Sequence, residues 1–423
     1  MKFTRYKTSL IGLGRIVPGL MISVMLVFSS CEQDGDGTSL ETPNGDAGIN
    51  YIRLPEPTTS DSLLVSATLG TGIVIVGENL GGTREIWFND QQASLTPTFV
   101  TNKTIFVSVP SVAPSKVTDK LYLVDANKDT LVYDFVVSIP VPELYAVKNE
   151  WPKPGEHLLI AGNYFFEPVT VTFQGGGVGD IVAVSQTQIE VVIPEGATEG
   201  PIKLSTNFGE TESTFHLWDK RNIILNFDDK VANGWRIGLR EDLDGPIDGK
   251  YLVVRGNIAK NQRDEGPGAP AESPLTMEFW GGPAGRTENF YPSYPNSYRD
   301  YVLKFEAKVK KWYGGSLNLC LATPGHSASN QEIWSNSINA RAVWAPWAAA
   351  GEEFTTGDEW ITVVVPMSEF QYFMDAPSDV VYTPNQKFVE SAAGSFSTWM
   401  LGSPENTGNA VEFYIDNVRF VKP

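Results

Sequence analysis

The sequence predicts an all-β protein made of several modules, and three observations support this fold class. Apolar and polar residues alternate with a period of two along much of the chain, and beyond the N-terminal segment no stretch of ten or more residues has a convincing 3.6-residue period. Gly (39) and Pro (28) are plentiful, which favours frequent turns and few long helices. A length of 423 residues suggests two to four domains.

The first 30 residues have the organisation of a secretory signal. Four basic residues lie before position 16, an apolar stretch covers residues 16–28, and two serines precede Cys31. This apolar stretch is too short to span a bilayer, so we predict a signal peptide over residues 1–30. The position of Cys31 resembles a bacterial lipobox, in which the thiol is acylated. An ordinary secreted protein with a coincidental Cys is the alternative.

Residues 31–50 are rich in Gly, Asp, Thr, Ser and Asn, with hardly an apolar side chain. Such a segment cannot bury enough surface to fold, and we predict a flexible tether. Its start, residues 32–37, is acidic and Gly-rich and resembles the tag that exports lipoproteins of Bacteroidota to the cell surface. The predicted location is the outer membrane, with the chain surface-exposed and lipid-anchored through Cys31.

Charge and cysteine content limit the function classes. The formal net charge is −18, and removal of the four positive residues of the signal leaves −22 on the mature chain. Nucleic acids and anionic lipids both require positive surface, so neither is an expected ligand. Cys320 has no partner once Cys31 carries lipid, which excludes an intramolecular disulfide. We expect Cys320 to be a small buried apolar residue.

An internal repeat defines two small modules. Residues 72–80 resemble residues 155–165, and residues 105–110 resemble residues 189–194, with offsets of 85 and 84 residues. This period, with short alternating strands, predicts two tandem immunoglobulin-like sandwiches over residues 51–139 and 140–217. The Gly-Asn pair that follows each apolar run predicts a tight turn with positive φ.

The second copy carries the motif from which a family resemblance follows. Pro142 and Tyr145 precede a Pro-Gly pair at 154–155, and Ile160, Gly162 and Phe165 follow with fixed spacing. This pattern resembles the TIG/IPT family of immunoglobulin-like domains. The first copy departs from the pattern because it lacks the Pro-Gly pair, which leaves its boundaries open.

Residues 218–423 form a third module of different composition, which contains nine of the eleven Trp residues. It opens with an alternating strand at residues 223–229 and closes with another at residues 411–420. Pairing of the first strand with the last is typical of a jelly-roll sandwich. These two strands, with the Gly-Trp pair at 234–235, resemble many β-jelly-roll carbohydrate-binding modules.

Catalytic signals are weak. The chain has three His residues, no Cys/His cluster with metal-ligand spacing, no Gly-x-Ser-x-Gly and no phosphate-binding loop. A glycosidase needs two facing carboxylates, which Glu278, Glu332, Glu352 and Glu353 could provide, but the repeated acidic strand pattern of jelly-roll hydrolases is absent. We predict a protein that is not an enzyme. A surface endo-glycanase or polysaccharide lyase remains the alternative.

Binding of sugar has better support, because neutral polysaccharides present flat C–H faces that stack on aromatic rings while polar groups fix their hydroxyls. Trp235, Trp312, Trp360 and Trp399 lie beside strands and are expected in the core. Pro346 is expected to interrupt a strand and to turn Trp344 and Trp347 toward one surface. The candidate glycan-binding residues are Trp334, Trp347, Trp344, Trp280, Arg341, Asn336 and Tyr294.

Three acids at the ends of the first and last strands suggest a metal. Asp228, Asp229 and Asp416 could hold a structural Ca²⁺ through carboxylate oxygens, or they could be solvated strand-end acids. No other cofactor is expected.

The whole chain resembles the surface glycan-binding proteins of Bacteroidota polysaccharide utilisation loci, in particular those with a C-terminal xyloglucan-binding domain. The stretches at residues 341–347 and 354–366 carry this resemblance best. It implies non-catalytic capture of a neutral polysaccharide (a β-glucan, xyloglucan or related hemicellulose) through an aromatic platform. It also implies delivery to a neighbouring porin-like transporter and its lipoprotein lid. An adhesin that grips a protein through its TIG repeats is a further alternative.

Overall fold

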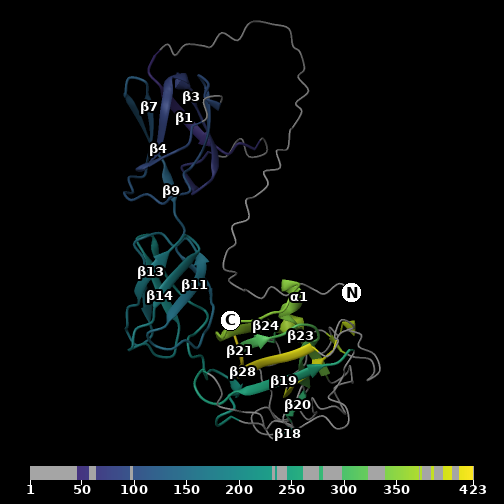
Figure 1. Ribbon diagram of the computed structural model, residues 1–423. Helices are drawn as coiled ribbons and strands as arrows, with labels where there is room; N and C mark the ends of the chain where they lie inside the picture. The colour runs from purple at the N-terminus through teal and green to yellow at the C-terminus, as the bar shows by residue number, and fades with distance from the viewer. Residues whose placement is uncertain are drawn as a thin grey trace. The chain divides into compact units, whose positions relative to one another are not determined.

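The computed structural model describes twelve segments of the chain (Figure 1). They are residues 45–56, 63–95, 99–230, 234–235, 245–260, 276–279, 298–322, 339–370, 372–373, 383–384, 394–402 and 409–422. Strands dominate these segments, and the one α-helix among them is α1 (Pro346–Ala350), so the predicted all-β class is confirmed. No helix in the described part of the chain is both long and apolar enough to cross a membrane.

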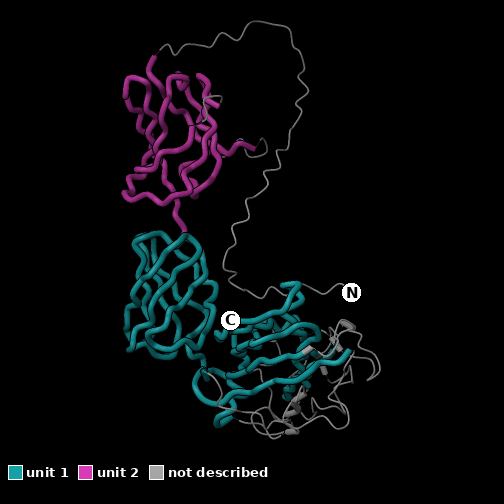
Figure 2. Tube along the Cα trace, viewed as in Figure 1, with its two compact units in different colours: residues 1–12, 142–423 teal, residues 13–141 magenta. Residues whose placement is uncertain are grey.

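The described residues form two compact units, one ending at Val141 and the other beginning at Pro142 (Figure 2). The first unit is an immunoglobulin-like sandwich whose main sheets have the strand orders β1-β3-β6 and β5-β4-β7-β8, while β2 pairs with β9. Its core holds Ile52, Ile75, Phe88, Ile105 and Leu121. Its strands are β1 (Gly48–Arg53), β2 (Ser66–Thr68), β3 (Gly72–Glu78), β4 (Thr83–Phe88), β5 (Gln91–Gln92), β6 (Thr104–Ser108), β7 (Lys120–Asp125), β8 (Thr130–Asp134) and β9 (Val136–Ser138).

The second unit begins with another immunoglobulin-like sandwich. Its sheets have the orders β10-β11-β14-β13 and β12-β15-β16, around a core that includes Ile160, Phe165, Val171, Ile189 and Leu204. Its strands are β10 (Glu143–Val147), β11 (His157–Asn163), β12 (Thr170–Phe173), β13 (Asp180–Val184), β14 (Gln188–Val192), β15 (Ile202–Thr206) and β16 (Gly209–Glu212).

The repeated glycine has a different role from the predicted one. Neither Gly77 nor Gly162 has positive φ; that conformation falls on Asn79 and on Tyr164. A Cβ at either glycine would lie 2.0 Å from the carbonyl oxygen of the neighbouring strand. The glycine is therefore required because β1 and β10 approach β3 and β11 very closely, and the turn prediction for it was wrong.

The C-terminal module is a sandwich of two sheets, and its first and last strands pair as predicted, with Ile223 opposite Arg419. One sheet has the order β17-β28-β21-β24, with β19 also on β28, and the other has the order β18-β20-β27-β22-β23-β25-β26. The strands of the first sheet are β17 (Ile223–Leu225), β19 (Leu252–Ile258), β21 (Val302–Lys311), β24 (Ile361–Pro366) and β28 (Asn409–Val421). Those of the second are β18 (Gly234–Trp235), β20 (Thr276–Phe279), β22 (Ser316–Ala322), β23 (Asn339–Trp344), β25 (Tyr372–Phe373), β26 (Thr383–Pro384) and β27 (Ser395–Leu401).

The second immunoglobulin-like domain and the C-terminal module share a buried joint. Trp151 packs into a cluster with Ile223, Tyr251 and Trp360 of the C-terminal module. Trp218 Nε1 donates to the Pro152 carbonyl oxygen at 2.7 Å. This apolar packing makes the two domains one compact unit.

Charged groups in the same joint are paired across the two domains. The carboxylate of Glu150 accepts from Lys304 at 2.6 Å and from Arg419 at 2.7 Å, and Arg419 also donates to Glu306 at 2.8 Å. All four side chains are at most 5% exposed. The network contains two acidic and two basic side chains, so their charges can offset one another. Buried charges are tolerated when they are paired in this way.

Candidate functional site

The candidate site is the face of the seven-stranded sheet opposite the main core, termed the outward face; its side chains on β22 and β27 are buried in the structure. In β22 the odd positions Leu317, Leu319 and Leu321 belong to the main core. Side chains alternate along a strand, so Ser316, Asn318, Cys320 and Ala322 lie on the other face. This face was not among the predicted sites, although the alternation of Leu with Ser, Asn and Cys along residues 316–320 is a sequence signal for it.

The neighbouring strands extend the same face. In β27, Phe396 and Met400 are core residues, and Ser395, Ser397 and Trp399 have the opposite parity. Trp399 pairs with Asn318 across the sheet and Ser397 with Cys320. From the other side, β23 places Val343 opposite Asn318 and Arg341 opposite Cys320. Directly paired residues share a face, so these side chains are neighbours.

The strand register shows that residues of the outer strands, toward both edges of the sheet, lie on the same face. Glu278 of β20 pairs with Ser397, and Trp235 of β18 pairs with Glu278. At the other edge Tyr372 of β25 pairs with Arg341. The positions on this face therefore combine aromatic, amide, hydroxyl, acidic and basic residue types.

Asn318 holds an unused hydrogen-bond acceptor. Its side chain is 0% exposed, and its Nδ2 donates to backbone oxygens of Ser316 at 3.3 Å and Trp399 at 3.5 Å. Its Oδ1 has no hydrogen-bond partner among the described residues. An unsatisfied buried acceptor costs about 1–3 kcal/mol, so a donor supplied by a ligand would be stabilising here, but because the Asn318 side chain is fully buried the donor can reach it only after the surrounding residues move.

Trp399 and Cys320 complete the middle of the face. Trp399 is 1% exposed, and its Nε1 donates to Ser397 Oγ at 3.0 Å. Burial raises the pKa of the Cys320 thiol to about 12, so the thiol stays protonated and inert. The prediction that Cys320 is a small buried residue is confirmed.

Trp344 and Trp347 are core residues, and the predicted role of these two rings as a surface platform was wrong. Trp344 is 2% exposed and meets Phe305 and Trp312 edge-on, with ring centroids 5.3 and 5.1 Å away. Pro346 does end the strand, but it begins helix α1, which returns Trp347 to the core. The Trp347 Nε1 donates to the Gly315 carbonyl at 2.7 Å.

The remaining predicted binding residues divide into two groups. Arg341 lies on the outward face but is 1% exposed, so its side chain is buried within that face and does not lie at its exposed edge. Trp280, Trp334, Asn336 and Tyr294 lie outside the described residues. Of the Trp residues expected in the core, Trp312, Trp360 and Trp399 are buried, although Trp399 lies on the outward face. The side chain of Trp235 is outside the described set.

The predicted metal trio is not assembled. Asp229 accepts from Asn226 Nδ2 at 2.6 Å, whereas Asp416 is buried in β28. Within the described segments no three or more His, Cys, Asp or Glu side chains are arranged to hold a metal ion.

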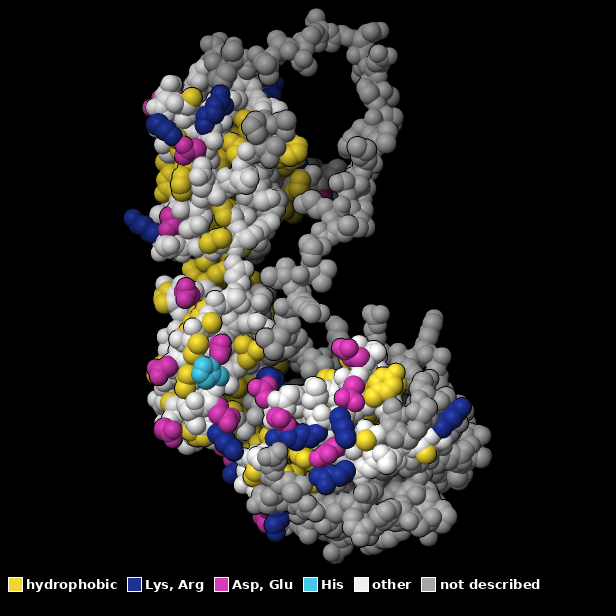
Figure 3. Space-filling model, viewed as in Figure 1, with side chains coloured by type: hydrophobic (Ala, Val, Ile, Leu, Met, Phe, Trp, Pro, Cys, Tyr) yellow, Lys and Arg dark blue, Asp and Glu magenta, His cyan; other side chains and the backbone are white. Residues whose placement is uncertain are grey.

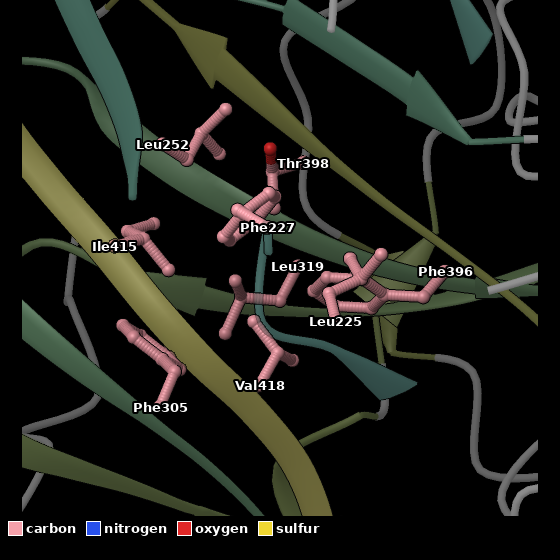
Figure 4. A pocket seen from close by; sticks show the side chains of 9 residues that line it. All are labelled: Leu225, Phe227, Leu252, Phe305, Leu319, Phe396, Thr398, Ile415 and Val418. Atoms are coloured by element: carbon pink, nitrogen blue, oxygen red, sulfur yellow. The ribbon is translucent and has the colours of Figure 1, made fainter. Parts of the chain in front are cut away.

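A pocket between the two sheets is unsuited to sugar (Figure 4). Eight of its nine lining residues are apolar, and Thr398 offers the one hydroxyl. The side chains labelled in Figure 4 converge from both sheets of the sandwich. This pocket is a packing gap in the core, since a polysaccharide requires several polar partners.

The fold and the outward face together define a two-sheet β-sandwich binding module carried on immunoglobulin-like repeats. Residues 217–422 match the family model of the surface glycan-binding protein B xyloglucan binding domain, and this part of the chain belongs to that domain family. The chain is therefore a relative of the Bacteroidota surface glycan-binding proteins, as the sequence predicted.

The chain is also similar to solved structures and to a curated protein. Surface glycan-binding protein PbSGBP-B from Prevotella bryantii is 25% identical, with a TM-score of 0.66, over 90% of this chain and 99% of that one. SGBP-B from a complex xyloglucan utilization locus in Bacteroides uniformis is 17% identical, with a TM-score of 0.45, over 90% of this chain and 100% of that one. An IPT/TIG domain-containing protein from Bacteroides ovatus is 29% identical over 154 residues, which are 35% of this chain. The match spans 30% of that curated relative's length.

Proposed function

We propose that this protein binds a neutral polysaccharide, of the β-glucan, xyloglucan or related hemicellulose class, on the outward face of its seven-stranded sheet. The observation that carries the proposal is the free acceptor of Asn318 beside Trp399, on a polar face of a module in the xyloglucan-binding-domain family. Once the residues that bury Asn318 move aside, a sugar hydroxyl can donate to that amide oxygen, and an aromatic ring can stack on the sugar's C–H face.

Four of the predicted binding residues lie in segments that adjoin the strands of this sheet in the sequence. Trp280 directly follows β20, and Tyr294 lies in the segment that leaves this strand. Trp334 and Asn336 lie in the segment that joins β22 to β23, the two strands that carry Asn318 and Arg341. All four residues therefore remain candidates for direct contact with the ligand.

Electrostatics favour a neutral ligand. The mature chain has a formal charge of −22 once the signal is removed, which disfavours acidic polysaccharides. On the described surface of the C-terminal module visible in Figure 3, basic side chains are interspersed with acidic ones.

We further propose that binding occurs without catalysis. Glycosidases use two carboxyl groups about 5–10 Å apart. Among the described strand positions of the outward face, Glu278 is the one acid. Incubation with a polysaccharide panel should release no new reducing ends, and release would establish the glycanase alternative.

The binding test uses isothermal titration with xyloglucan and mixed-linkage β-glucan. Trp334→Ala should weaken binding by roughly 5- to 150-fold, on a scale of about 1–3 kcal/mol borrowed from ring stacking in nucleic-acid complexes. Asn318→Ala should weaken it by roughly 2- to 12-fold, because a typical neutral hydrogen bond contributes about 0.5–1.5 kcal/mol. The matched control is Trp87→Ala, a half-buried Trp in the first immunoglobulin-like domain, which should bind normally. Loss of glycan binding in the control alone would place the glycan site in the first immunoglobulin-like domain.

We also propose that acylated Cys31 anchors the chain at the outer face of the outer membrane, where it passes glycan to a porin-like transporter with a lipoprotein lid. The support is the lipobox-like sequence and the similarity to surface glycan-binding proteins. Cys31→Ala should release the protein into the medium or periplasm, and protease added to intact cells should cut the wild type. A wild type that is membrane-bound but protected from protease would contradict surface exposure.

A further inference from the structure

The first immunoglobulin-like domain presents an aromatic row on the outer face of one sheet. In β4 and β7, Phe88 and Leu121 belong to the core, so Trp87 and Tyr122, one position away, face outward. The strand register places Trp87 opposite Tyr122, and Tyr122 opposite Val132 of β8. Val132 is 50% exposed and the two rings are half-buried. These three residues, termed the aromatic row, are therefore accessible to a partner.

Charged residues border the aromatic row on both sides along the strands. On one side Lys120 of β7 forms an ion pair with Asp134 of β8, and on the other side Lys128 forms one with Glu85 of β4. These four residues carry no net charge, although acids outnumber bases in the whole chain. Figure 3 shows hydrophobic side chains on the first unit with acidic and basic side chains beside them. An apolar centre within a polar rim is typical of a protein–protein interface, where Trp and Tyr often contribute most of the binding energy.

The aromatic row suits a protein better than a sugar. Trp87 Nε1 already donates to Glu85 Oε2 at 3.0 Å, and the Tyr122 hydroxyl already donates to Thr118 Oγ1 at 3.2 Å. The polar atoms of both rings are therefore occupied within the chain, whereas a sugar needs several polar partners. The ring faces and the Val132 side chain remain available, and they match another apolar surface.

We propose that the aromatic row pairs two copies of this chain, sheet face against sheet face. A two-fold axis that runs along the row places it against its copy and exchanges the two charged sides. Lys120 of each chain then meets Glu85 of the other, and Asp134 meets Lys128, so the face is complementary to itself. Chains anchored at one membrane surface, as proposed above, would encounter one another often enough to form even a weak dimer.

The test measures self-association of the chain from residue 32 onward by sedimentation equilibrium. Over roughly 1 μM to 1 mM the wild type should show a monomer–dimer equilibrium. Trp87→Ala should raise the dimer dissociation constant at least about tenfold, because an aromatic residue at the centre of an interface is removed from both copies. Phe106→Ala is the matched control, since this ring is 43% exposed on β6 of the other sheet, and it should dimerise as the wild type does. Glycan affinity per chain should stay unchanged in both variants.

Exchange of charges tests the two-fold arrangement. Lys128→Glu or Asp134→Lys alone places like charges opposite each other and should weaken dimerisation by about threefold or more. An equimolar mixture of the two variants restores opposite charges at both contacts and should form mixed dimers. The Lys128 and Asp134 side chains are 73% and 87% exposed, so the domain should fold with either change.

Three results would overturn the proposal. A wild type that remains monomeric over the whole concentration range would exclude a second copy and assign the aromatic row to a different partner. Dissociation by Phe106→Ala, with Trp87→Ala still dimeric, would place the interface on the other sheet. A mixture of the two charge variants that stays as monomeric as each variant alone would contradict the two-fold arrangement. Loss of glycan affinity in Trp87→Ala would instead assign the row to sugar.

Discussion

Trp344 and Trp399 show how position within a strand decides the role of an aromatic residue. They lie in β23 and β27, the two strands that flank β22, yet Trp344 pairs with Leu317 and Trp399 pairs with Asn318. Leu317 belongs to the core and Asn318 to the outward face. One position of difference along a strand therefore separates a ring that stabilises the sandwich from one beside the candidate site.

Trp344→Ala should consequently act on stability and not on binding. The ring is 2% exposed among other aromatic rings, and truncation of a buried Trp costs about 3–5 kcal/mol. We expect a steep drop in Tm by calorimetry, with normal affinity for glycan per folded molecule. Normal melting together with lost binding would instead return Trp344 to the ligand site.

Some single-residue roles could be predicted from the sequence and others could not. The burial of Trp312 and Cys320 followed from apolar strand context. The return of Trp347 to the core did not, because α1 has five residues and is too short to show a helical period. The position of Asn318 on the outward face could have been predicted from the alternation of Leu317, Leu319 and Leu321. The sequence does not say, however, which face of a strand contacts the ligand.

At the level of elements, the long strands β21 and β28 carry both the core and a charged outer face. Their outward positions include Lys304, Glu306 and Arg419, which the second immunoglobulin-like domain buries through Glu150. No local pattern could predict this network, because Glu150 and Arg419 are 269 residues apart. The repeat and the pairing of first and last strands were predictable, since each depends on apolar alternation within a short stretch.

The network predicts a pH dependence of stability centred on Glu306. Burial raises the pKa of Glu306 from 4.5 to about 7, against the attraction of Arg419. The folded state therefore binds the proton more tightly than the unfolded chain, and this contribution is complete below about pH 4.5 and lost as pH rises to about 7. Each unit of pKa shift corresponds to about 1.4 kcal/mol.

Glu306→Gln should flatten that dependence, because the amide stays neutral at every pH. We expect wild type and variant to melt similarly near pH 5 and the variant to lose less stability between pH 5 and 8. Glu359→Gln is the matched control: its salt bridge with Lys148 is largely exposed and should contribute at most about 1 kcal/mol. Parallel melting curves for Glu306→Gln and wild type across this range would contradict the assignment.

For the molecule as a whole, the joint around Trp151 determines where the chain can be divided. The sequence places a module boundary at residue 218, but Trp151 packs on Ile223, Tyr251 and Trp360, and Glu150 pairs with Lys304 and Arg419. A cut at 218 removes both contacts, whereas a cut at Pro142 lies at the division between the two compact units.

The piece 142–423 should therefore melt at the temperature of the corresponding transition in the full chain, and the piece 218–423 should melt lower. The shorter piece exposes the apolar cluster that Trp151 covers, which also favours aggregation. In the shorter piece the charged groups of the joint become hydrated, which compensates for their lost ion pairs. The loss of stability therefore arises mainly from the exposed apolar surface.

Glycan affinity per folded molecule should agree within about threefold between 142–423 and the full chain, or under about 0.7 kcal/mol. Calorimetry and titration on the three proteins check both statements. Equal melting of the two pieces would show that the joint contributes no stability, and weaker binding by 142–423 would show that the first immunoglobulin-like domain takes part in the ligand site.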